Sequence, residues 1–192
     1  ISNWKGNYGL INEARGNVSN IGVDGLLAEC LFSDTQSRFG GIAHTLRNAT
    51  VENCFVVGAS VYDNGVTNDI DIDLPSSSTG SRIGGIVGNV RGDDASDVPT
   101  AFIRNCYVIA NISVTGVASG ITVGGIVGFL DRADSVTNIK TANLIGNAKI
   151  TLQNNFAGMY VGGLIGNANK WWYIVLGVLM ISVSLQLCIL PC

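Results

Sequence analysis

The sequence contains few residues that favour helices. Its 192 residues include only three Glu, four Lys and three Pro, against 25 Gly and 19 Asn. Glu and Lys are good helix formers, whereas Gly and Asn favour turns, so this composition argues against a helical bundle and favours strands joined by many turns. Hydrophobic residues make up 47% of the chain and charged residues 13%. This balance excludes intrinsic disorder, which requires low hydrophobicity and high charge.

Several kinds of functional site are also missing from the sequence. The net charge is −3 and the isoelectric point is near 4.9, so we expect no nucleic-acid partner. There is no Cys-x-x-Cys pair, which leaves zinc and redox motifs unsupported. The single histidine, His44, has no partner motif for acid–base or metal chemistry, and we expect it to be a solvent-facing turn residue. We therefore predict neither a catalytic residue nor a cofactor.

One short phrase recurs along the chain: an apolar residue, Gly-Gly, two apolar residues and Gly. Full copies occupy positions 83–88, 123–128 and 161–166, and an earlier copy at 39–44 has His44 in place of the last Gly. A weaker copy lies near position 9. The first glycines of the four clearer copies stand at positions 40, 84, 124 and 162, so the spacing is nearly regular. We expect the phrase glycines to be structural: Gly40, Gly41, Gly84, Gly85, Gly88, Gly124, Gly125, Gly128, Gly162, Gly163 and Gly166.

A second phrase follows the first at variable distance. It reads Val-Glu-Asn-Cys-Phe-Val at positions 51–56 and Ile-Arg-Asn-Cys-Tyr-Val at 103–108, and it has decayed to Ala-Asn-Leu-Ile at 142–145. A period near 40 made of two apolar runs predicts an all-β stacked β-solenoid, with two coils of about 20 residues per repeat. Asn at recurrent turn positions can adopt the left-handed conformation. A β-sandwich is the alternative, but it gives no reason for the phrases to recur.

The two phrases together resemble the GLUG repeat, in which Gly-Gly-apolar-apolar-Gly is followed by an Asn-Cys-aromatic strand. This family forms arrays on bacterial and some protist surface proteins, including adhesin-like proteins and the stalks of IgA-cleaving peptidases. The resemblance covers about positions 9–166, and His44 and the decayed third phrase depart from it. It implies a β-helical, extracellular module with an adhesive or spacer role and no catalytic residues.

The repeats divide the chain into three parts. We expect a partial N-terminal repeat at 1–38, solenoid repeats at 39–170 and an apolar tail at 171–192. Since the chain begins at Ile1 without a signal-type segment, we expect it to be cut from a longer protein. The tail carries no charged side chain, and the stretch from Trp171 to Leu190 is long enough to cross or contact a membrane as a helix. Polar and apolar residues alternate in its second half, so a final β-strand is the alternative.

Five cysteines are present: Cys30, Cys54, Cys106, Cys188 and Cys192. Cys54 and Cys106 occupy the same place in successive repeats. With two coils per repeat they would lie roughly 9–10 Å apart along the stack, because neighbouring strands are about 4.8 Å apart. A disulfide needs Cα atoms within about 7 Å. We therefore predict that both are buried free thiols.

Three carboxylates stand at alternate positions: Asp69, Asp71 and Asp73 alternate with Ile70 and Ile72. Alternation places the three on one face of a strand, which we expect to be a solvated outer face with the isoleucines inward. Such a row of carboxylates is also a candidate Ca²⁺ site. In a carbohydrate-active solenoid enzyme, these residues, or Asp93 and Asp94, would act on the polysaccharide.

Two kinds of surface motif complete the candidates. Arg91-Gly92-Asp93 is a tripeptide that integrin-type receptors recognise when it protrudes on a loop. Three Asn-x-Ser/Thr sequons begin at Asn17, Asn48 and Asn111, and they would be glycosylated only if exposed in a secretory eukaryote.

The sequence therefore predicts a non-enzymatic cell-surface or secreted module that acts in adhesion, in display or as a rigid spacer. Its expected partners are glycans, surface proteins or other copies of itself. The alternatives are the carbohydrate-active enzyme and a subunit whose open ends stack into filaments.

Overall fold

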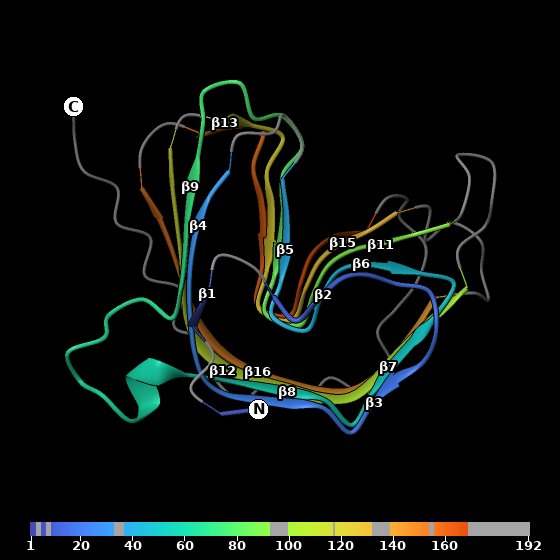
Figure 1. Ribbon diagram of the computed structural model, residues 1–192. Helices are drawn as coiled ribbons and strands as arrows, with labels where there is room; N and C mark the ends of the chain where they lie inside the picture. Colours follow the sequence, from blue (N-terminus) through green and yellow to red (C-terminus); the bar gives the residue numbers. More distant parts are fainter. Residues whose placement is uncertain are drawn as a thin grey trace.

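The computed structural model describes residues 1–2, 5–6, 9–32, 37–92, 100–116, 118–131, 139–153 and 156–168. Within these residues the regular structure is β-strand, apart from one 3-10 turn, η1 (Ala59–Val61). The strands form four parallel sheets (Figure 1). The eight-stranded sheet contains β1 (Lys5–Gly6), β3 (Val18–Ser19), β4 (Gly22–Leu31), β7 (Thr50–Glu52), β8 (Phe55–Gly58), β9 (Ile70–Leu74), β12 (Ala101–Gly116) and β16 (Ile139–Gln153).

Three smaller sheets complete the fold. The five-stranded sheet contains β2 (Ile11–Ala14), β6 (Ala43–Arg47), β11 (Val87–Arg91), β15 (Val127–Leu130) and β19 (Ile165–Ala168). The four-stranded sheet contains β5 (Arg38–Gly40), β10 (Arg82–Gly84), β14 (Thr122–Gly124) and β18 (Tyr160–Gly162). The two-stranded sheet contains β13 (Ala118–Ser119) and β17 (Phe156–Ala157).

Equivalent residues of successive repeats stack directly on one another. Gly84 pairs in parallel register with Gly40 on one side and with Gly124 on the other, and Gly124 pairs with Gly162. The decayed third phrase keeps the register, because Leu144 pairs with Cys106. The fold therefore has the stacked parallel sheets of a solenoid, as the recurring phrases predict.

The predicted number of coils is wrong. From one phrase glycine to the next, the chain advances by one rung, because the two glycines lie on adjacent paired strands. A repeat therefore forms one coil of about 40 residues rather than two of about 20 residues. The reason is that the two phrases lie on different sides of the same coil: the Gly-Gly phrase joins the four- and five-stranded sheets, and the Asn-Cys phrase joins β7 to β8. Sequence spacing gives the length of a repeat but not the number of turns in it.

Each coil follows a bent path around one apolar interior (Figure 1). The four-stranded sheet stands opposite β4 and β9. From it the chain bends sharply into the five-stranded sheet. Strands β7 and β8 then bring the chain back along the lower side of the coil in this view. Inward residues form continuous columns such as Phe39, Ile83 and Val123, all fully buried. Burial of these columns requires neighbouring rungs, since one coil cannot cover its own apolar side.

The Gly-Gly bend depends on close backbone approach. A Cβ on Gly84 would lie 2.2 Å from the Val87 carbonyl oxygen and 2.7 Å from the Gly128 nitrogen on the next rung. None of the phrase glycines has a positive φ, so left-handed geometry is not the reason for them. The glycines allow a strand of the four-stranded sheet to pack against the five-stranded sheet one rung later.

His44 does not face solvent, contrary to the prediction from the sequence. Its exposed fraction is 6%, and its Nε2 accepts a hydrogen bond of 2.9 Å from the Gly9 amide. At the equivalent position, a Cβ on Gly88 would lie 2.5 Å from the Phe39 carbonyl oxygen of the preceding rung. His44 instead contacts the preceding rung through its hydrogen bond with the Gly9 amide. Burial lowers the pKa of His44 to about 4.

The corner between β7 and β8 is built by asparagines. Asn20, Asn53 and Asn105 stack on successive rungs with φ values of 56°, 53° and 53°. The Asn53 Nδ2 donates to the Asn20 Oδ1 at 3.2 Å, and the Asn105 Nδ2 donates to the Asn53 Oδ1 at 3.0 Å. The expectation that recurrent Asn residues hold left-handed turns is confirmed.

The two ends of the chain differ in how far they are described. In the predicted N-terminal repeat, 1–38, strands β2, β3 and β4 stack on β6, β7 and β8, so this segment continues the same sheets. The apolar tail, 171–192, with Cys188 and Cys192, lies outside the described residues. In the part of the chain that the structure describes, no helix is long and apolar enough to cross a membrane.

Candidate functional site

The row of three aspartates does not form one solvated face. Ile70 and Ile72 point inward and are fully buried, as predicted, but Asp69 is also fully buried. The segment at η1 folds over it: the Asp69 carboxylate accepts hydrogen bonds from the Ser60 amide and hydroxyl, both at 2.7 Å, and from the Asn111 amide at 2.6 Å. Asp69 is therefore a structural anchor that fixes this segment to two neighbouring rungs.

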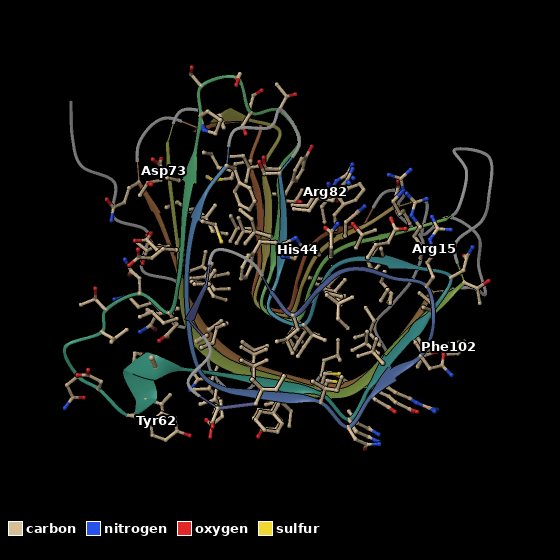
Figure 2. All side chains as sticks on the ribbon, viewed as in Figure 1. Arg15, His44, Tyr62, Asp73, Arg82 and Phe102 are labelled. Atoms are coloured by element: carbon tan, nitrogen blue, oxygen red, sulfur yellow. The ribbon has the colours of Figure 1, made fainter. Side chains whose placement is uncertain are left out.

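The other two aspartates stay on the outer side of β9. Asp71 is half-buried and stands in register with Glu29 and Ser113, while Asp73 is exposed and points away from the interior (Figure 2). The Thr115 hydroxyl lies 3.3 Å from the Asp73 carboxylate. Among the described residues, no three His, Cys, Asp or Glu side chains are grouped closely enough to hold a metal ion. Asp93 and Asp94 lie outside the described residues.

The surface motifs are described only in part. Arg91 ends β11 and is half-buried, Gly92 follows it, and Asp93 lies outside the described residues, so the geometry of the tripeptide stays untested. Asn17 and Asn48 are exposed. Asn111 is half-buried, and its Nδ2 donates to the Ser60 hydroxyl at 3.2 Å, which removes the freedom that a glycosylated amide needs.

Cys54 and Cys106 are buried free thiols, as predicted, but the expected separation is wrong. They lie on adjacent rungs, since the Tyr107 amide donates to the Cys54 carbonyl at 3.1 Å. The Cys106 thiol lies 3.2 Å from the Arg104 carbonyl oxygen. Contact with Cys54, together with burial, raises the pKa of Cys106, and burial raises the pKa of Cys30 to about 12. Cys30 and Cys106 are therefore core residues rather than reactive thiols, whereas the hydrogen bond with Cys106 lowers the pKa of Cys54.

An aromatic pair stands on the outer side of the eight-stranded sheet. The rings of Phe55 and Tyr107 stack with centroids 5.0 Å apart and planes 5° from parallel. Phe55 leans over the preceding rung, where Gly22 leaves room for it because a Cβ there would meet the ring. The aromatic residues of the two intact second phrases therefore stack on adjacent rungs, and only part of each ring is accessible.

A cluster of arginines was missed by the sequence reasoning. We call it the arginine face: Arg38 and Arg82 on the four-stranded sheet, with Arg47 and Arg91 on the five-stranded sheet. The signal was present, because an arginine stands directly before the Gly-Gly phrase and another stands three residues after it in both copies. The outer sides of the two sheets meet at the Gly-Gly bend, which brings the four side chains together.

Among the described residues, two carboxylates lie near the arginine face. Glu13 accepts hydrogen bonds from Arg15 at 2.7 Å and from Arg47 at 2.6 Å. Burial raises the pKa of Glu13, but these two hydrogen bonds and the arginine charges outweigh burial and hold the pKa below its ordinary value. Asp131 follows β15 and contributes the second nearby carboxylate. In Figure 2, Arg82 and Arg15 lie on the same side of the chain, in the open angle beside the bend.

Comparison with known proteins gives one informative match. The chain is 32% identical over 93 residues to Halomucin of Haloquadratum walsbyi, a stretch that covers 47% of this chain and 1% of Halomucin. No protein-family model matches the chain. No solved structure matches it. The similarity is distant and partial, and this chain corresponds to a very small fraction of the Halomucin length.

Proposed function

We propose that this chain is a non-enzymatic module of a cell-surface or secreted protein, in which stacked rungs hold an outer surface in a fixed, extended geometry. The observation that carries the proposal is the register: equivalent residues of consecutive repeats stack in unbroken columns across the four- and five-stranded sheets. Such an array can be lengthened by adding rungs, which suits a spacer or a display surface.

The similarity to Halomucin, a large surface glycoprotein, supports the proposed location. The GLUG resemblance of the two phrases, which no family model confirms, would imply the same role. Outer side chains held in register on successive rungs also suit multivalent contact with glycans or proteins.

A rung duplication tests the spacer function. In the variant, the segment 85–124 is copied once in tandem, which adds one complete repeat from one phrase glycine to the next. We expect a folded protein whose long axis grows by about 4.8 Å, the distance between neighbouring strands. Small-angle X-ray scattering and circular dichroism measure the two properties. A matched insertion of the shorter segment 85–114 breaks the register and should give a less stable protein.

The enzyme alternative predicts a different result. If the outer carboxylates act on polysaccharides, the purified chain should release reducing ends from a panel of acidic and neutral polysaccharides, and Asp71→Asn should abolish the release. The proposal predicts no release by either protein. Release that depends on Asp71 would contradict the non-enzymatic role.

Location needs its own test in the organism that makes the protein. Protease added to intact cells should remove an epitope on an exposed loop, such as the one containing Tyr62 and Asn64. An epitope that is cleaved only after lysis would contradict a surface location.

A further inference from the structure

The arginine face combines like charges at strand spacing. Arg38 pairs in register with Arg82 across β5 and β10, and Arg47 pairs in register with Arg91 across β6 and β11. In-register neighbours on parallel strands are about 4.8 Å apart, and like charges at this distance are unfavourable. Burial lowers the pKa of Arg38, and the charges of Arg91 and Arg47 lower it further, while Glu13 and Asp131 act in the opposite direction.

Within the described part of the chain, these charges are not fully compensated. The described carboxylates near these arginines are those of Glu13 and Asp131. Glu13 is already bound to Arg15 and Arg47. Arg38, Arg82 and Arg91 form no ion pair with a described residue. The chain as a whole has a net charge of −3, so this face has the opposite sign to the rest.

Unpartnered polar atoms in the same place give an independent observation. Asn89 is fully buried, yet neither its Nδ2 nor its Oδ1 has a hydrogen-bond partner among the described residues, and the buried Nε of Arg38 also has none. Buried polar atoms without partners are rare in native proteins, because each pays the cost of losing its hydrogen bonds to water. A ligand that accepts hydrogen bonds would satisfy Nδ2 and Nε.

The register relates these atoms to one another. Asn89 lies on the outer side of the five-stranded sheet, in one column with Phe129. The Arg82 guanidinium lies 4.3 Å from the centre of the Phe129 ring, which belongs to the next rung. Because Arg38 pairs in register with Arg82, and Asn89 with Phe129, we infer that Arg38 extends toward Asn89 by the same offset.

We propose that the arginine face is a binding site for a polyanionic polysaccharide, whose carboxylate or sulfate groups are held by Arg38, Arg82 and Arg91 and by the amide of Asn89. A guanidinium group can form bidentate hydrogen bonds with two oxygens of a carboxylate or a sulfate group. The choice of a polysaccharide as the carrier of the anion rests on the proposed surface role. A nucleic acid is disfavoured by the acidic remainder of the chain and by the lack of an aromatic series for stacking bases.

The test compares two arginine variants with a matched control. Arg38→Gln/Arg82→Gln removes two charges from the arginine face, whereas Arg104→Gln removes an exposed arginine that pairs with Glu52 on the outer side of the eight-stranded sheet. Binding of heparin (sulfated), polygalacturonate (carboxylated) and neutral dextran to the full chain is measured by calorimetry at low and high salt.

We expect heparin, polygalacturonate or both to bind, and dextran not to bind. The polymer that binds identifies which anion the site prefers. Binding should weaken with salt, as an electrostatic interaction does. The double variant should bind about tenfold more weakly or worse, because two hydrogen bonds to charged groups are lost. Arg104→Gln should bind as the unchanged chain does. Circular dichroism checks the fold, and Arg91→Gln should weaken binding in the same direction if the double variant does not fold.

Three results would overturn the proposal. One is the absence of binding to either charged polymer at low salt. Another is equal binding by the unchanged chain and by folded arginine variants. The third is equally tight binding of duplex DNA with the same dependence on the arginines. None of these results bears on the spacer function, which the rung duplication tests separately.

Discussion

At the scale of single residues, the neighbouring rung decides which side chain a phrase position can carry. Gly88, Gly128 and Gly166 each face backbone of the rung before them, and a Cβ at any of the three would lie within 2.6 Å of a carbonyl oxygen or a backbone nitrogen. His44 occupies the same phrase position but meets the Gly9 amide, to which its imidazole is hydrogen-bonded.

Substitution of a phrase glycine should be costly. Gly84→Ala would place a Cβ 2.2 Å from the Val87 carbonyl oxygen, and backbone cannot move aside cheaply. We expect the free energy of unfolding to fall by about 2 kcal/mol or more. Gly16→Ala is the matched control, because nothing lies within 4 Å of a Cβ there. Urea unfolding measures both, and a stability of Gly84→Ala equal to that of the control would contradict the close approach.

His44 should make stability depend on pH. Its pKa is about 4 in the folded chain and 6.5 as the ordinary value, because burial disfavours the charged form. As the pH falls from 6.5 to 4, the His44 imidazole is protonated in the unfolded chain before it is protonated in the folded chain. The stability contributed by the neutral imidazole is therefore fully present above pH 6.5 and decreases between pH 6.5 and pH 4. The decrease amounts to about 3 kcal/mol at most.

The control for this prediction is His44→Gln, which can still accept a hydrogen bond but does not titrate. Carboxylates titrate equally in both proteins, so the difference between their unfolding free energies, followed from pH 7 to pH 4, reports His44 alone. Parallel curves for the two proteins would show that the imidazole stays accessible to protons.

At the scale of strands and turns, a column of asparagines stabilises the corner between β7 and β8 on successive rungs. Asn53 combines a left-handed φ with hydrogen bonds to Asn20 on one side and Asn105 on the other. Asn53→Ala should lose both contributions and reduce stability by about 2 kcal/mol, while Asn53→Gly keeps the φ and should lose about 1 kcal/mol. Asn64→Ala, in an exposed turn, should change the free energy of unfolding by less than about 0.5 kcal/mol.

Thermal unfolding of the three variants checks this order. Equal losses for Asn53→Ala and Asn53→Gly would mean that the left-handed conformation costs nothing at this corner. A loss for Asn64→Ala as large as that for Asn53→Gly would mean that the ladder hydrogen bonds add nothing measurable.

The sequence was informative where a position repeats and uninformative where a single contact decides. Recurring glycines and asparagines predicted stacked parallel strands and left-handed corners, because the same constraint acts on every rung. Asp69 was misplaced, since alternation cannot reveal that the segment at η1 covers it. The arginine face was missed because its members lie before and after the bend, and only the fold shows that the outer sides of two sheets meet there.

At the scale of the whole molecule, the architecture is a stack in which each rung buries the apolar side of the next. The ladder from β2 through β6, β11 and β15 to β19 has no strand out of order, and all of its pairs are parallel. Outer groups of adjacent rungs therefore lie in register: the rings of Phe55 and Tyr107 on the eight-stranded sheet, and Arg38 beside Arg82 at the Gly-Gly bend. A surface module could use either series without a change in fold.

The central claim is that each repeat makes one rung. Ser2, Asp24, Val57, Ile109 and Asn147 form one column, so four strand spacings separate the exposed residues Ser2 and Asn147. Spin labels carried on unnatural amino acids at these two positions avoid the native cysteines. Double electron–electron resonance should give a distance of about 20 Å between the labels, from four spacings of about 4.8 Å. Two coils per repeat would instead separate the labels by about 30 Å or more, and a distance in that range would contradict the account.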